Sequence, residues 1–306
     1  MSKPLLISEV SANDITGVKV VLFDVDNTLI GNDSPSLPSK KFQQHAKDLA
    51  NTLPIGLATA RPYSKVQHIL EACDMKGLSI LCNGAQIYDG KERKVLVEHT
   101  IPVDACLRIM RRLQADNVFH WALDDSVDYF WQGAVATDDQ GLGTYARAVD
   151  LWDKKSDNNE LIENYVPSKP ITIVASHITE KQKDDVLAYA KSFAEQDVVG
   201  LFAHQLTLED GSEVFDVLIT NKLSNKKDAL QKVSEQLGVP AENFMAVGDG
   251  HNDKVIIEHV GYGVAMGNAV QEVKDVAKFI TTDWDEDGAA KILDKLKQSK
   301  NDKATN

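Results

Sequence analysis

The feature that most constrains this chain is a run of four large apolar residues that ends in two carboxylates. Residues 20–23 read Val-Val-Leu-Phe, and Asp24 and Asp26 follow directly. A short strand that is apolar on both faces is typical of the middle of a parallel sheet, and open α/β sheets place their chemistry at the carboxyl ends of such strands. If the backbone stays extended, two acids two residues apart point the same way. On its own the motif could equally form an acidic turn, so its interpretation depends on the rest of the chain.

Strand and helix patterns alternate after this motif and again near the end of the chain. Short buried strands and amphipathic helices are predicted from apolar periodicity, with strands at residues 55–58, 78–81 and 244–247 and helices over residues 39–51 and 226–237. Polar residues follow each strand, among them Thr59, Asn83 and Asp249. This order predicts an α/β fold with a Rossmann-like, doubly wound parallel sheet.

The middle of the chain has a different pattern. Asp89 and Gly90 form a hairpin signal. Helical patterns over residues 103–113 and 180–193 are surrounded by strand-like segments at residues 118–121, 127–131, 171–174, 198–206 and 214–219. Strands grouped as hairpins around helices predict an α+β domain. We therefore predict a core domain from residues 1–85 and 220–306 and an inserted α+β cap domain from residues 86–219.

Composition limits the partners and the compartment. The net charge is −13, so nucleic acids and anionic membrane surfaces are not expected partners, and an anionic ligand would need a local positive site or a metal. The three cysteines lack Cys-x-x-Cys spacing, which favours reduced thiols over a disulfide framework. Neither a signal-like apolar run at the amino terminus nor a membrane-length apolar segment is present. We expect a cytoplasmic protein.

The candidate chemistry lies at four separate element ends. These supply Asp24 with Asp26, then Thr59, then Lys226, and finally Asp249 with Asn252 and Asp253. Carboxylates that converge on one crevice repel one another unless a hard divalent cation lies among them, and Mg²⁺ prefers oxygen ligands. Beside such a cation, an Asp carboxylate can act as a nucleophile toward phosphorus. Lys and Thr side chains can then stabilise the transferring phosphoryl group.

These residues resemble the motifs of haloacid dehalogenase superfamily phosphatases, and among them the Cof-type hydrolases. The four family motifs fall, in the family's order, on residues 24–28, Thr59, Lys226 and residues 248–253. The likeness extends to residues 83–85, 265–269 and 285–288. The long interval between Thr59 and Lys226 is the only one that could contain a cap domain, as in Cof-type members.

The resemblance implies a role for each matched residue. Asp24 would be the nucleophile and a Mg²⁺ ligand, and Asp26 would be the general acid and base and a ligand through its backbone carbonyl. The remaining roles are Asp249 as a metal ligand, Thr59, Lys226 and Asn252 as phosphate-binding residues, and Asp253, Asn83 and Arg61 as residues that support these groups or contact the substrate. Three positions depart from the usual family pattern, namely Asn27, Ala60 and Lys227, where glycine is common. These departures concern loop geometry and not the reacting groups.

The expected function is a magnesium-dependent phosphatase that hydrolyses small phosphomonoesters, such as sugar phosphates or related metabolites, through an aspartyl-phosphate. Two alternatives stay open. A phosphomutase or phosphotransferase would pass the same phosphoryl group to a hydroxyl instead of water, and a noncatalytic phosphometabolite-binding protein could use the same fold. The sequence specifies neither the metabolite nor the oligomeric state.

Overall fold

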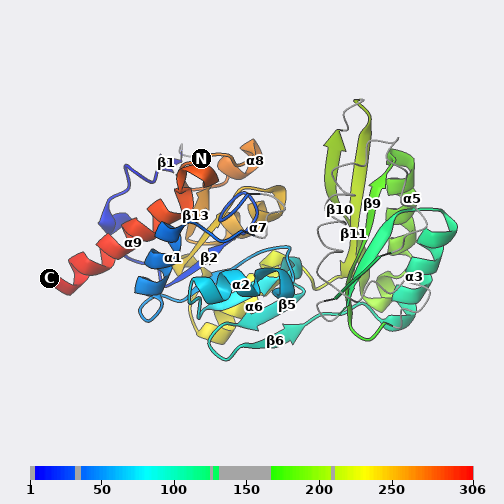
Figure 1. Cartoon of the computed structure of the whole chain (residues 1–306), viewed down its shortest axis with the longest axis horizontal. Helices are drawn as coiled ribbons and strands as arrows, with labels where there is room; N and C mark the ends of the chain where they lie inside the picture. Colours follow the sequence, from blue (N-terminus) through cyan, green and yellow to red (C-terminus); the bar gives the residue numbers. More distant parts are fainter. Residues whose placement is uncertain (1–3, 32–35, 125–126, 131–166, 208–210, 306) are drawn as a thin grey trace. The chain divides into compact units, whose positions relative to one another are not determined.

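The computed structural model describes residues 4–31, 36–124, 127–130, 167–207 and 211–305 (Figure 1). The chain divides into two compact units. We call Met1–Glu98 together with Ser224–Asn306 the core unit, and His99–Leu223 the inserted unit. Among the helices that the structure describes, none is both long enough and apolar enough to cross a bilayer.

A parallel sheet forms the centre of the core unit. Within the described residues it has six strands, in the order β1 (Leu5–Leu6), β14 (Phe279–Ile280), β13 (Tyr262–Ala265), β12 (Phe244–Gly248), β2 (Val20–Phe23) and β3 (Ile55–Leu57). All neighbouring strands run parallel. Every residue of β2 and β12 is buried, because both strands lie in the interior of the sheet. The predicted α/β, Rossmann-like core is confirmed.

Helices cover both faces of this sheet, as Figure 1 shows for α1 and α9 on one side and α7 on the other. The helix bounds are α1 Lys40–Leu49, α2 Tyr63–Ala72, α6 Lys226–Leu237, α7 His251–His259, α8 Gln271–Lys274 and α9 Gly288–Thr305. The ring of Phe42 on α1 meets Phe23 of β2 edge-on, with 5.1 Å between centroids. The Nζ of Lys297 on α9 donates a hydrogen bond to Oδ2 of Asp48 on α1 at 2.6 Å. Helix α9 is thereby held against α1, which itself packs on the sheet.

A hairpin extends the core unit beyond the predicted boundary. Strands β4 (Leu78–Leu81), β5 (Gln86–Asp89) and β6 (Lys94–Glu98) pair antiparallel in that order, and Ile80 bridges to Ala58, just past β3. The Asp89 carboxylate accepts the turn N–H groups of Lys91 and Glu92, as the hairpin signal predicted. We expected the insert to begin at residue 86, but β5 pairs with β4, so the core unit continues to Glu98 and resumes at Ser224.

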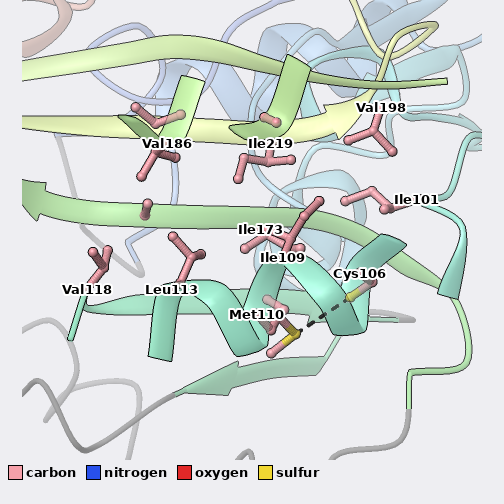
Figure 2. Close-up of a cluster of buried hydrophobic side chains, with 14 of the residues drawn as sticks. Ile101, Cys106, Ile109, Met110, Leu113, Val118, Ile173, Val186, Val198 and Ile219 are labelled. Carbon is pink, nitrogen blue, oxygen red and sulfur yellow. Dashed lines mark hydrogen bonds between the residues drawn. The ribbon is translucent and has the colours of Figure 1, made fainter. Parts of the chain in front are cut away.

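The inserted unit has an antiparallel sheet with helices on one face. The described strands follow the order β10 (Val198–Thr207), β11 (Glu213–Asn221), β9 (Pro170–Ile178), β7 (His120–Asp124) and β8 (Val127–Phe130). Helices α3 (Val103–Ala115) and α5 (Glu180–Lys191) cover the sheet (Figure 1). Figure 2 shows side chains of α3, such as Ile109 and Leu113, facing Ile173 of β9. The α+β architecture is as predicted, and the last residue of the strand expected over residues 127–131 lies outside the described residues.

Candidate active site

The register of the sheet brings the first and fourth motifs together. Phe23, the last residue of β2, is paired with Val247 of β12, and the backbone N–H of Asp24 donates to the carbonyl of Val247 at 2.8 Å. Parallel strands in this register end at the same edge of the sheet. Asp24 and Asp249 therefore emerge side by side from segments more than two hundred residues apart.

Lys226 joins this edge from the start of α6. The side chain of Asn225 caps the helix by accepting the N–H of Asp228 at 2.8 Å, which fixes where the first residue of the helix points. The Lys226 Nζ lies 3.3 Å from Asp24 Oδ1 and 2.6 Å from Asp253 Oδ1. The side chain is only 2% exposed. Burial by itself would lower the pKa of Lys226, but the charges of Asp253 and Asp24 outweigh burial and raise it.

Asp253 organises the turn that carries Asp249. Its Oδ2 accepts the backbone N–H groups of Asp249 and Gly250, both at 3.1 Å, while its Oδ1 accepts Lys226. A Cβ at Gly248 would lie 2.4 Å from the carboxyl carbon of Asp253, so this turn requires glycine there. The Oδ1 of Asp249 accepts the hydroxyl of Thr28 at 3.3 Å. Asp253 thus positions both the lysine and the neighbouring acid.

Three carboxylates crowd this edge of the sheet. Oxygen atoms of Asp24, Asp249 and Asp253 lie within 4.8 Å of one another. Burial, followed by the charge of Asp253, raises the pKa of Asp24 well above its usual value. The same two causes raise the pKa of Asp249 to about 7. Oxygen donors at this spacing suit a hard cation, and a cation would offset the burial and the repulsion that together raise both pKa values.

Asp26 lies outside this cluster and is held by Arg61. The Arg61 Nε donates to Asp26 Oδ2 at 2.9 Å, and Nη2 donates to Oδ1. The two side chains are 16% and 29% exposed. Asp24 and Asp26 were expected to point the same way if the strand continued, but β2 ends at Phe23 and the two carboxylates bind different cationic side chains. A two-point pair with guanidinium orients a carboxylate more strictly than one bond can.

Thr59, Asn83 and Asn252 are joined by hydrogen bonds. The buried Thr59 accepts the N–H of Arg61 on its Oγ1 at 3.2 Å, and its carbonyl accepts the N–H of Asn83 at 3.0 Å. Asn252 Nδ2 donates to Asn83 Oδ1 at 3.2 Å. Asn83 has a φ of 52°, a left-handed conformation that asparagine tolerates. These three predicted residues therefore form one hydrogen-bonded network.

Asn27 explains one departure from the family pattern. Its φ is 51°, the left-handed region in which glycine is the usual residue and asparagine the best tolerated alternative. The carbonyl of Asn27 accepts Asn268 Nδ2 at 2.9 Å. Thr28 and Asn268 were not among the predicted site residues, although both lie in segments that resemble the family. The feature that could have identified them is their position shortly after a buried strand.

The comparisons with known proteins identify the family. The model of the haloacid dehalogenase-like hydrolases matches residues 21–293. This chain belongs to that family. The match confirms the resemblance to Cof-type members that the four motifs indicated.

Similar proteins agree over nearly the whole chain. Phosphatase YwpJ of Bacillus subtilis is 25% identical, with 91% of this chain and 100% of that protein covered. The 5-amino-6-(5-phospho-D-ribitylamino)uracil phosphatase YcsE of the same organism is 27% identical, with 90% and 94% covered. Among solved structures, the phosphatase BT1666 of Bacteroides thetaiotaomicron has a TM-score of 0.71 at 21% identity, with 94% and 98% covered. The sugar phosphatase BT4131 has a TM-score of 0.69 at 20% identity, with 90% and 98% covered; at these identities the structures show a shared fold.

Proposed function

We propose that this hydrolase is a magnesium-dependent phosphatase that hydrolyses small phosphomonoesters through an aspartyl-phosphate on Asp24. The observation that carries the proposal is the group of three buried or half-buried carboxylates around one buried ammonium, Lys226. Membership of the hydrolase family and the phosphatase names of the relatives support an enzyme of this class.

The charge balance favours a divalent cation. Asp24, Asp249 and Asp253 carry three negative charges when ionised, and within the described residues the ammonium that binds this group is that of Lys226. Both oxygens of Asp253 already accept hydrogen bonds. Asp24 and Asp249 would therefore hold the metal, with the backbone carbonyl of Asp26 as the further ligand that the family resemblance implies, and an all-oxygen set suits Mg²⁺. When bound, the metal would neutralise phosphoryl oxygens and draw the substrate to Asp24.

Asp24 is placed to attack phosphorus. Lys226 binds its Oδ1 at 3.3 Å, which orients the carboxylate and leaves Oδ2 for bond formation. The carboxylate forms a bond to phosphorus as the bond to the leaving oxygen breaks. Lys226, Thr59 and Asn252 would hold the phosphoryl oxygens by charge and hydrogen bonds.

Asp26 would move the protons. In the first step it donates a proton to the leaving oxygen, which releases an alcohol. In the second step it takes a proton from the water that attacks the aspartyl-phosphate, so inorganic phosphate leaves and Asp24 is restored. Both oxygens of the Asp26 carboxylate accept from Arg61 in this structure, so one of these two bonds would open when Asp26 carries the proton, while the other keeps the side chain oriented.

The substrate would be a small phosphorylated metabolite, such as a sugar phosphate. YcsE is named for a phosphorylated ribityl compound and BT4131 for sugar phosphates, which supports this substrate class. The net charge of −13 disfavours nucleic acid and anionic membrane partners, in keeping with a cytoplasmic enzyme. The inserted unit would act as the cap that selects the leaving group.

A panel of phosphorylated metabolites, assayed for phosphate release with Mg²⁺ and with chelator, tests the proposal. We expect turnover of several phosphomonoesters in Mg²⁺ and none in chelator. Full turnover in chelator would exclude the metal role. Transfer of the phosphoryl group to an added sugar, with little free phosphate, would indicate the phosphotransferase alternative. Binding of a metabolite without turnover of any substrate would indicate a binding protein.

A further inference from the structure

The loop after β13 is tied to the fourth motif. The N–H of Met266 donates to the carbonyl of Gly248 at 3.0 Å, and the N–H of Val270 donates to the carbonyl of Asp249 at 3.0 Å. Residues 266–270 therefore lie beside the backbone of Gly248 and Asp249. These two bonds couple the loop to the peptide groups on both sides of Asp249.

Asn268, in the middle of this loop, is bonded on both sides of its amide. Its Nδ2 donates to the carbonyl of Asn27 at 2.9 Å, and its Oδ1 accepts the N–H of Trp284 at 3.1 Å. A Cβ at Gly31 would lie 3.0 Å from the ring of Trp284, so this ring packs on the segment that follows the first motif. The side chain of Asn268 thus links the loop over residues 266–270 to the first motif and to the segment before α9.

The bond to Asn27 controls the backbone beside Asp26. Asn27 is left-handed, with a φ of 51°, and rotation about its backbone would turn the adjoining peptide groups, including the carbonyl of Asp26. Fixing the Asn27 carbonyl restricts that rotation. The bond from Thr28 Oγ1 to Asp249 Oδ1 provides a second link between the two motifs, but it is longer, at 3.3 Å.

We propose that Asn268 is a positioning residue that sets the distance between the Asp26 carbonyl and Asp249 and thereby the affinity for Mg²⁺. The inference rests on the proposed function, which makes these two groups metal ligands. Residues that orient metal ligands typically change metal affinity by about 10- to 100-fold when they are removed. We expect Asn268→Ala to weaken Mg²⁺ binding by about tenfold.

The chain offers a matched control. Asn243 Nδ2 also donates to a backbone carbonyl, that of Gly17, at 2.9 Å. Asn243 precedes the central strand β12 and Gly17 precedes β2, so this bond lies at the amino edge of the sheet, opposite the candidate site. Asn243→Ala removes the same kind of bond and should leave Mg²⁺ affinity within about twofold of the wild type, since no metal ligand depends on it.

Isothermal titration of the full-length, substrate-free proteins with Mg²⁺ decides the question, with thermal unfolding in chelator as the folding check. A tenfold loss in Asn268→Ala but not in Asn243→Ala supports the proposal, and excess Mg²⁺ should then restore most of kcat. Equal affinities in both variants would overturn it.

If Asn268→Ala does not fold, Asn268→Asp decides. That variant keeps the bond to Trp284 and adds a charge that by itself would tighten cation binding, so weaker binding supports the positioning role and equal or tighter binding refutes it. A wild type that binds no Mg²⁺ would overturn the proposed function together with this inference.

Discussion

The buried part of the candidate site, at the carboxyl edge of the core sheet, and the interior of the inserted unit are both shielded from water, but opposite kinds of side chain fill them. Asp24, Lys226 and Asp253 are 6%, 2% and 1% exposed at the first. At the second, aliphatic side chains such as Ile173 and Ile219 pack between helices and sheet (Figure 2). Buried charge costs free energy unless it is paired, whereas buried aliphatic surface is stabilising. The charged groups at the carboxyl edge are therefore suited to binding a charged ligand, whereas the aliphatic interior of the inserted unit stabilises the fold.

Asp24→Asn should have the largest effect. It removes the nucleophile, and it also removes one of the carboxylate charges that repel one another at the candidate site. Removal of a nucleophile can cost about 10⁶-fold in kcat. The thermal midpoint in chelator should not fall, since a neutral amide at this position is not repelled by Asp253 and Asp249 as the carboxylate is. Phosphate release and differential scanning calorimetry measure the two effects. An active Asp24→Asn enzyme would place the nucleophile elsewhere.

Asp26→Ala tests whether the acid outside the cluster has a separate role. Loss of a general acid costs about 10²- to 10⁴-fold, and the loss should be largest for alkyl phosphates, whose leaving oxygen needs a proton. For p-nitrophenyl phosphate the loss should be smaller, because its leaving group is stable as an anion. Steady-state kinetics on both substrates gives the ratio. Equal losses would contradict the acid role.

The alternating pattern allowed much of the core to be predicted from sequence, including the start of α6 at Lys226 and the strand that ends before Asp249. Periodicity reveals a strand but not its partner, so the pattern did not show that β5 pairs with β4 of the core unit. The pairing of Arg61 with Asp26 joins residues 35 positions apart, and that of Asn268 with Asn27 joins residues 241 apart. Such contacts depend on how strands are ordered in the sheet and on local turns, which a one-dimensional pattern does not specify.

Lys226→Met tests how much the buried ammonium contributes to the free energy of unfolding. Removing one partner of a buried ion pair typically costs about 3 to 5 kcal/mol, because the other charges stay buried. Lys222→Met is the matched control, since Lys222 also lies 2.6 Å from a carboxylate, that of Asp197, but this pair is more than half exposed. Its loss should cost less than about 1 kcal/mol. Urea unfolding in chelator measures both variants, and equal costs would show that the buried ammonium has no special role.

His120 supplies the smallest effect. It is a titratable group buried in the inserted unit, as Asp124 and Asp216 also are, and its pKa is shifted by that burial. It is fully buried, and its Nδ1 lies 2.8 Å from the carbonyl of Val118, so we assign the proton to Nδ1. Burial lowers the pKa of His120 to about 4, although the bond to Val118 opposes the shift. In the unfolded chain the pKa is about 6.5, so below that pH the unfolded state binds more protons.

The stability that neutral His120 provides should therefore be complete above about pH 6.5 and decline as the pH falls toward 4. Between pH 7 and pH 5 the loss amounts to about 2 kcal/mol by linkage. His120→Leu removes this titration, so the wild type should lose more unfolding free energy than the variant as the pH falls. Hydrogen exchange of the β7 amides at the two pH values reports on the inserted unit alone. Parallel pH profiles for the two proteins would show that His120 is protonated, or reaches water, in the folded state.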